Sequence, residues 1–203
     1  GSEMCIRDRD MPSLDGTLSG SVRLSGVAAN PTASGGFSSP LLTVAGVPLR
    51  DVEASGRYSS GAFEIARASA RVLDGLLTAE GSIADDDITG EPRIDLRGSL
   101  SSIDLAELKT VGWADALSGR ASLTDVVLTS RSGRNSGELL MSYEGVRYGE
   151  IALGNAAGGL LVRNETAYVT LSSPDMGYEL SGEVSMVGEA RHIDGDVLLS
   201  GLR

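Results

Sequence analysis

The sequence predicts an all-β protein built as one elongated antiparallel sheet that is curled into an open groove. Three observations predict it. Apolar and polar residues alternate with a period of two in many segments from Leu14 onward, which sends alternate side chains to opposite faces of a strand. Glycine accounts for 27 of the 203 residues, about twice the usual share of ~7%. Aromatic residues are few: one tryptophan, five tyrosines and two phenylalanines.

The clearest strand is residues 178–186, where every even position is apolar or glycine and every odd position is Glu or Ser. Such a segment has one dry and one wet face. The same pattern holds for 18–24, 77–83 and 94–100. Weaker candidates are 41–44, 52–58, 63–70, 123–129, 138–143, 159–162, 167–171 and 196–199. We therefore expect at least ten short strands, separated by turns such as Ser60-Gly61 and Asp74-Gly75.

One segment near the middle of the chain departs from this alternation. Asp104 is a good helix cap, Glu107 follows three residues later, and Leu105 and Leu108 are one helical turn apart. The pattern predicts a short helix or helical turn over residues 103–117, with Trp113 packed against the rest of the protein.

The two halves of the chain resemble each other. Leu18-Ser19-Gly20 recurs as Leu117-Ser118-Gly119, and Gly46-Val47 recurs as Gly145-Val146, each 99 residues later. We therefore expect a first β repeat over 14–103 and a second over 104–203 that begins with the helix and is truncated, as in a fragment of a longer array. Residues 1–10 share no pattern with these repeats and resemble a cloning scar or a translated adapter remnant.

The composition favours an open groove over a closed barrel and argues against a sandwich. A sandwich core normally contains several bulky aromatic residues, each of which buries ~150–250 Å². Here the apolar face consists of aliphatic residues and glycine, and Gly20, Gly81, Gly98 and Gly182 on that face would let the sheet bend. In a closed barrel, the same glycines would lie at the corners.

Few side chains are suited to catalysis or metal binding. The chain has one histidine, His192, and one cysteine, Cys5, too few for a zinc site or a disulfide. Asp85, Asp86 and Asp87 lack the spacing of a calcium loop and are expected to form a solvated hairpin. We therefore expect no enzymatic activity, no cofactor and no metal. The net charge of −11 argues against nucleic-acid binding, and no apolar run is long enough to span a bilayer.

The order of these motifs resembles a known family. Leu18 to Gly26 follows the pattern L-x-G-x-V-x-L-x-G; Asn30-Pro31, then Gly46 to Val52 and Asp74 to Gly81, come after it. This order is similar to the repeats of TamB-type translocation and assembly module proteins, members of the AsmA-like group of the bacterial envelope. The resemblance covers about residues 14–203 and is one of repeat style.

The resemblance implies a β-taco groove in the periplasm, within a parent protein anchored in the inner membrane by parts outside this sequence. Such proteins are implicated in carrying phospholipids to the outer membrane, and TamB also in protein translocation and assembly with TamA, an outer-membrane barrel protein. The expected partners are thus phospholipid acyl chains and a TamA-type barrel, with membrane contact only through the rest of the parent. The expected groove-lining residues share an aliphatic character: Leu18, Val22, Leu24, Leu77, Ile83, Ile94, Leu96, Leu100, Leu180, Val184 and Met186.

Two other functions are compatible with the sequence. One is a β-rich surface or adhesin repeat, in which the apolar face is a dry closed core and the outer face binds a partner protein. The other is a hydrolase that uses Asp and Glu on a β scaffold, although spacing alone does not pair any two carboxylates.

Overall fold

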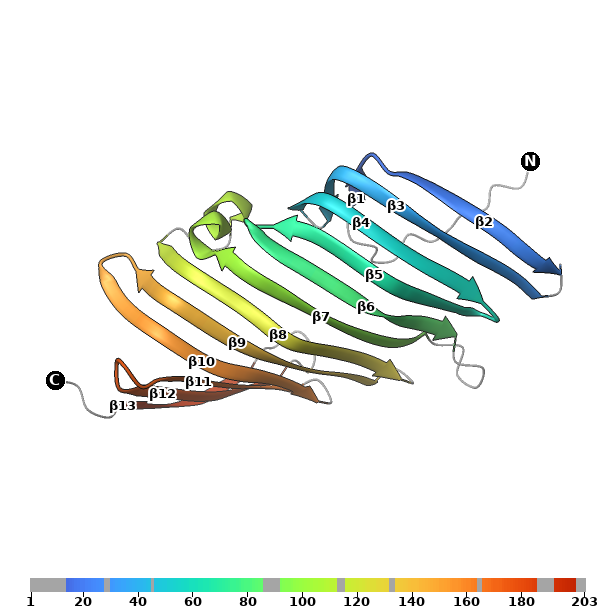
Figure 1. Ribbon diagram of the computed structural model, residues 1–203. Coiled ribbons are helices and arrows are strands. Elements are labelled where there is room, and N and C mark those ends of the chain that lie inside the picture. Colours follow the sequence, from blue (N-terminus) through green and yellow to red (C-terminus); the bar gives the residue numbers. More distant parts are fainter. Residues whose placement is uncertain are drawn as a thin grey trace, which may run out of the picture.

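The structure is a computed structural model that describes residues 14–27, 30–44, 46–85, 92–112, 116–131, 134–163, 166–185 and 192–199. These residues form one antiparallel sheet in which each strand from β3 to β13 pairs with the next along the chain (Figure 1). The two ends of this order do not pair with each other, so the sheet is open. This confirms the predicted all-β fold and excludes a closed barrel for the described strands.

The strands are longer than the alternation alone predicted and contain up to 15 residues each. They are β1 (Leu14–Gly16), β2 (Ser19–Val27), β3 (Asn30–Val44), β4 (Val47–Ser59), β5 (Ala62–Val72), β6 (Gly75–Asp85), β7 (Pro92–Asp104), β8 (Leu117–Arg131), β9 (Arg134–Tyr148), β10 (Ile151–Arg163), β11 (Thr166–Ser173), β12 (Tyr178–Ser185) and β13 (His192–Leu199). β1 and β2 both pair with β3, at its opposite ends, and so flank it as one interrupted strand.

Tight turns connect the early strands. Ser60 and Gly61 have φ values of 51° and 78°, as in the two-residue hairpins that match strand twist. The next turn lies one residue before the predicted Asp74-Gly75: Leu73 and Asp74 have φ values of 48° and 61°, and Gly75 already belongs to β6. A left-handed leucine is unfavourable, but the Leu73 side chain packs against a core cluster, which stabilises this conformation.

The predicted helix is present but shorter than expected. It is a 3₁₀ helix, η1 (Leu105–Val111), and the carboxylate of its cap residue Asp104 accepts a hydrogen bond from the Ala106 amide at 2.9 Å. The helix ends at Gly112, whose left-handed conformation (φ 75°) terminates it before residue 117. Trp113 lies outside the described residues.

The buried core lies along one edge of the sheet. One cluster contains Ile103, Leu105, Ala121 and Val146, and the other contains Leu42, Val52 and Ala70. These residues lie near the strand ends on the side of η1, whose Leu105 and Leu108 pack into the first cluster. We call this side the curled edge, and the opposite side, near the turns that follow β4 and β10, the open edge.

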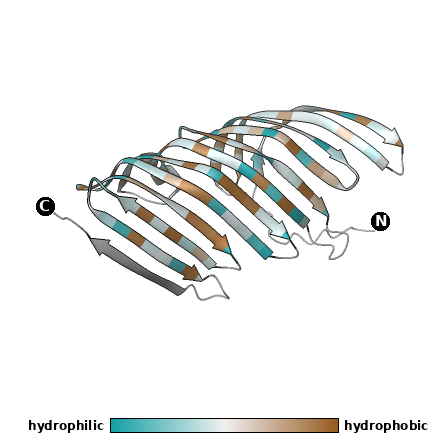
Figure 2. Ribbon diagram, turned by 60° about the horizontal axis from the view of Figure 1, so that its bottom comes forward, coloured by the Kyte–Doolittle hydropathy of each residue, from teal (hydrophilic) through white to brown (hydrophobic). Residues whose placement is uncertain are grey.

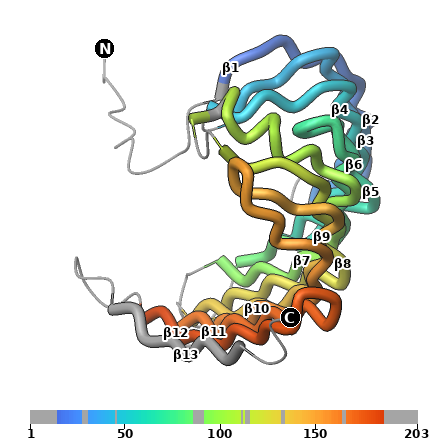
Figure 3. The backbone as a smooth tube through the Cα atoms, turned by 90° about the vertical axis from the view of Figure 1, so that its left-hand side faces the viewer, coloured from blue at the N-terminus to red at the C-terminus, as the bar shows by residue number. Residues whose placement is uncertain are grey.

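Breaks in strand register produce the curl, which Figure 3 shows as a curved profile open on one side. Shifts lie between Arg50 and Glu53 in β4, between Leu100 and Ile103 in β7 and between Thr124 and Val127 in β8. Asp51, Ser102 and Asp125 have positive φ values of 50°, 56° and 51° at these breaks. Bulges of this kind bend a strand and increase its twist. Bending therefore involves non-glycine residues that carried no signal in the sequence.

The glycines predicted to bend the sheet lie within its strand pairings, and one of them, Gly98, borders a register shift between β7 and β8. Gly20, Gly81, Gly98 and Gly182 all pair with a cross-strand partner. A Cβ atom at Gly20 would lie 2.5 Å from the Gly36 carbonyl oxygen, and one at Gly81 would clash with the Asp95 carbonyl oxygen. These two positions need glycine because the neighbouring backbone approaches closely.

η1 lies near the middle of the strand order. Seven strands, β1–β7, precede it and six, β8–β13, follow it among the described residues, and β7 pairs with β8 so that the sheet continues across the middle. β4 ends at Ser59 and β10 at Arg163, 104 residues later; β6 ends at Asp85 and β12 at Ser185, 100 residues later. The 99-residue matches are therefore out of step with the strands: Gly46 precedes β4, whereas Gly145 lies within β9.

Truncating a side chain at the curled edge should destabilise the fold. Ile103 is 8% exposed and packs in the cluster that holds η1, so Ile103→Ala is expected to lower the free energy of unfolding by about 2–4 kcal/mol. Val22 is 71% exposed, and Val22→Ala should change it by less than about 0.5 kcal/mol. Urea titration followed by circular dichroism measures both, and equal losses would contradict this location of the core.

Candidate functional site: an exposed apolar face

Strand register aligns apolar side chains into rows that cross the sheet. Residues paired across antiparallel strands point to the same face, so successive pairings define which positions share a row. The central row takes one residue from each strand from β2 to β12 and contains only aliphatic residues and glycine. Its members are Val22, Gly35, Gly56, Ile65, Gly81, Leu96, Leu128, Gly137, Val162, Ala167 and Val184.

Two further rows lie on the same face. The leucine row, nearer the curled edge, contains Ala70, Leu77, Leu100, Leu123, Met141, Gly158, Leu171 and Leu180. The aromatic row, nearer the open edge, contains Leu24, Ala33, Tyr58, Phe63, Ile83 and Ile94. The three rows contain no charged residue. At ~4.8 Å between strands, the central row extends for about 50 Å.

Nine of the eleven predicted groove residues belong to these rows. Val22, Leu96 and Val184 are in the central row; Leu77, Leu100 and Leu180 are in the leucine row; Leu24, Ile83 and Ile94 are in the aromatic row. Leu18 lies between β1 and β2 and is 50% exposed, and Met186 lies outside the described residues. That this face holds lipid stays a prediction.

The apolar face is buried at the curled edge and in part exposed towards the open edge, although Ala167 of the central row is only 8% exposed. Ala70 in the leucine row is 4% exposed, whereas Leu128 in the central row is 47% exposed and Leu24 in the aromatic row is 76% exposed. Figure 2 shows hydrophobic and hydrophilic positions alternating along the strands. A contiguous and partly exposed apolar surface of this extent is typical of a binding site for a protein, a membrane or a lipid-like ligand.

The opposite face is polar, and on it hydroxyl pairs and ion pairs join side chains of adjacent strands. Thr78 and Ser99 hydroxyls lie 2.9 Å apart across β6 and β7, and Thr129 and Ser136 hydroxyls lie 2.6 Å apart across β8 and β9. Arg57 Nη2 lies 2.9 Å from Glu64 Oε2. The Thr78–Ser99 pair is part-buried and the other two pairs are exposed. An exposed ion pair contributes little to stability, but together these polar groups keep this face hydrated.

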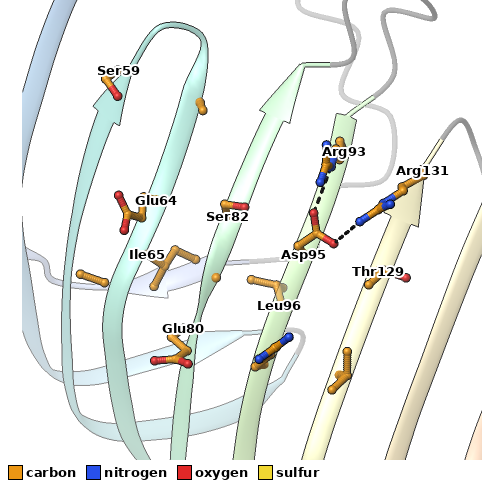
Figure 4. Close-up of a pocket in the computed structure, with 15 residues that line it drawn as sticks. Ser59, Glu64, Ile65, Glu80, Ser82, Arg93, Asp95, Leu96, Thr129 and Arg131 are labelled. Atoms are coloured by element: carbon orange, nitrogen blue, oxygen red, sulfur yellow. Dashed lines mark hydrogen bonds and ion pairs between the residues drawn. The ribbon is translucent and has the colours of Figure 1, made fainter.

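The polar face contains a hollow of about 760 Å³ over β5–β8, shown in Figure 4. Asp95 lies between two arginines there: it accepts hydrogen bonds from Arg93 Nε at 3.0 Å and from Arg131 Nη2 at 3.3 Å. Partial burial alone would raise the Asp95 pKa, but the hydrogen bonds and charges of Arg93 and Arg131 outweigh it, so the pKa lies below its usual value. A carboxylate held ionised in this way is a poor proton donor or base near neutral pH.

The polar face carries an apolar patch that was not predicted from the sequence. Leu161 pairs with Tyr168, and Leu140 pairs with Gly159 beside them; Leu140 is 53% exposed and Tyr168 is 42% exposed. The sequence indicates this patch through the apolar run Ala156-Ala157-Gly158-Gly159-Leu160-Leu161-Val162. The run lacks alternation, which is typical of a strand covered on both faces.

The remaining chemical predictions concern metals, membranes and the acidic loop. In the described ranges, no three His, Cys, Asp or Glu side chains are grouped closely enough to hold a metal ion. No helix in these ranges is long and apolar enough to cross a membrane. Asp85 ends β6, while Asp86, Asp87 and Cys5 lie outside the described residues. His192 is the first residue of β13, opposite Ser185.

Comparisons with known proteins identify no relative. The sequence matches no protein-family model, and no curated protein or solved structure is significantly similar to it.

Removing one of the two arginines should raise the Asp95 pKa. In Arg131→Gln, the carboxylate loses one charge-assisted hydrogen bond, so we expect its pKa to move up towards the ordinary value of ~3.9. Because the folded pKa is lowered, the stabilisation by this pair is present above the unfolded pKa and is lost as pH falls through the folded pKa. The pair is largely exposed, so its loss should cost less than about 1 kcal/mol.

An NMR titration of the Asp95 carboxyl carbon measures this pKa. Arg23→Gln in β2 is the control, since Arg23 lies on the same face at a distant strand. An unchanged Asp95 pKa in Arg131→Gln would contradict the arrangement.

Proposed function

We propose that this chain is a segment of a periplasm-spanning β-groove that shields and conducts phospholipid acyl chains between the inner and outer membranes. The observation that carries the proposal is the central row, an uncharged aliphatic path that crosses every strand from β2 to β12. Burial of acyl methylenes against such a path contributes about 0.8 kcal/mol per CH₂. The polar opposite face keeps the segment in water.

The proposal includes no chemical reaction, because lipid would move along the rows by diffusion. A path without fixed charges or hydrogen-bonding groups suits this role, since no single contact would hold a tail tightly. The same resemblance in repeat style supports placing the segment in the bacterial periplasm, in a parent anchored in the inner membrane. It also supports a role in outer-membrane biogenesis and protein translocation or assembly, with a TamA-type outer-membrane barrel as a partner.

A surface or adhesin repeat is the second candidate function. In that function the apolar face would be a dry closed core, which the open sheet does not provide. The patch of Leu140, Leu161 and Tyr168 on the polar face nevertheless favours a protein partner there. The two functions use opposite faces of the sheet, so one substitution on each face distinguishes between the two functions.

A charge on the apolar face should reduce lipid binding, whereas a charge on the polar face should not. Leu128 (apolar face, 47% exposed) and Leu140 (polar face, 53% exposed) are matched in residue type and exposure and lie on adjacent strands. Leu128→Glu should lower the bound fraction of dioleoyl phosphatidylethanolamine at least about tenfold, because the carboxylate must be desolvated beside the tails. Leu140→Glu should bind as the unsubstituted chain does.

Native mass spectrometry after incubation with vesicles of that lipid counts the lipids bound per chain. Circular dichroism verifies that both variants fold, which both exposures favour. Absence of lipid on the unsubstituted chain, or equal losses in the two variants, would overturn the proposed function. Loss of a captured protein partner in Leu140→Glu alone would favour the second candidate.

A further inference from the structure

A slot lined almost wholly by carbon atoms lies on the apolar face at β2–β5. Its volume is about 430 Å³, within the ~300–1,000 Å³ that is typical of small-molecule sites. Both phenylalanines of the chain, Phe37 and Phe63, line it together with Tyr58. These three rings are 42%, 42% and 40% exposed, so a large aromatic area is held partly in water at one place.

Two glycines form the floor of this slot. Gly35 and Gly56 are paired in the central row, and neither has a side chain of its own that would fill the slot. Tyr58 lies two residues beyond Gly56 on one side, and Phe37 lies two residues beyond Gly35 on the other. Residues two apart on a strand are ~6.6 Å apart, so the ring-bearing positions bound a strip about 13 Å wide at the backbone. The strip follows the direction of the central row.

The Phe63 ring narrows the slot. A Cβ atom at Gly56 would lie 2.9 Å from Phe63 Cζ and 3.3 Å from Phe63 Cε2, so the ring leans from β5 over the glycine of β4. Only glycine at position 56 leaves room for this ring. The slot is thus a groove between rings, whereas the central row elsewhere is lined by aliphatic side chains such as Leu96 and Leu128.

The lining selects for a ligand segment without hydrogen-bonding groups. A peptide or sugar inserted here would leave its polar groups without partners, at a substantial desolvation cost, whereas a methylene chain has none. If each methylene takes ~30 Å³, the volume of a water molecule in the liquid, the slot accommodates on the order of a dozen methylenes. We propose that this slot is a fixed seat for one lipid acyl chain; the proposal rests on the proposed function and adds a preferred resting place to it.

Photo-crosslinking locates the tail. The full 203-residue chain is incubated with phosphatidylcholine that has a diazirine on one palmitoyl chain, irradiated, digested and mapped by mass spectrometry. The expected result is that adducts concentrate on the peptides that contain Phe37, Tyr58 and Phe63, at several times the yield on β8–β12.

Filling the slot should remove this preference. Ala54 lines the slot on the row of Phe37, and Ala54→Phe is expected to lower adduct yield at the slot about tenfold while adducts elsewhere on the face persist. Val162→Phe is the matched control, because it adds the same ring to the central row at β10. Should Ala54→Phe fail to fold by circular dichroism, Phe63→Ala, at a residue 42% exposed, removes one wall instead and should spread the adducts over the face.

The outcomes separate the two proposals. Adducts spread evenly along the apolar face of the unsubstituted chain, or unchanged at the slot in Ala54→Phe or Phe63→Ala, would overturn the seat and leave the groove function standing. Adducts absent from the apolar face, or located on the polar face, would overturn both.

Discussion

Cross-strand register is the constraint on which the other properties of this protein depend. Each strand has one apolar and one polar set of side chains, and a shift of one residue in any pairing would interchange them. Because Leu96 is held opposite both Gly81 and Leu128, the apolar sets of three strands join into one surface. The same pairings, repeated from β2 to β12, make a row about 50 Å long. Without that alignment, the apolar residues would be isolated patches.

The curl divides this surface into a buried part that stabilises the fold and an exposed part that forms the candidate binding site. Near the breaks at Asp51, Ser102 and Asp125 the sheet turns inward, and Ile103, Leu105 and Val146 become a core under η1. Towards the open edge, no layer covers the rows among the described residues, and Val22 and Leu128 stay exposed. One alternating pattern thus provides both the hydrophobic stabilisation of the fold and the candidate site.

The charged residues have a supporting role in this arrangement. Asp95 is held between Arg93 and Arg131 on the polar face, with its pKa lowered, which suits a hydrated outer surface and not acid–base catalysis. The rows opposite contain no charge, so under the proposed function an acyl chain crosses no fixed polar site on them. The slot between Phe37, Tyr58 and Phe63 differs from this smooth path because large rings flank a floor of glycine.

The sequence by itself determined the all-β class, the wet and dry faces of the strands, and the cap at Asp104, because these follow from local periodicity and local hydrogen bonding. The same periodicity correctly predicted that nine of the eleven expected groove residues share one face of the sheet. The composition already favoured an open sheet, which the strand order confirms. The tertiary structure alone decided where the sheet bends and which apolar residues are buried. Bulges at Asp51, Ser102 and Asp125, a left-handed Leu73 held by the core, and pairings between strands all depend on contacts between distant segments, which no local pattern encodes.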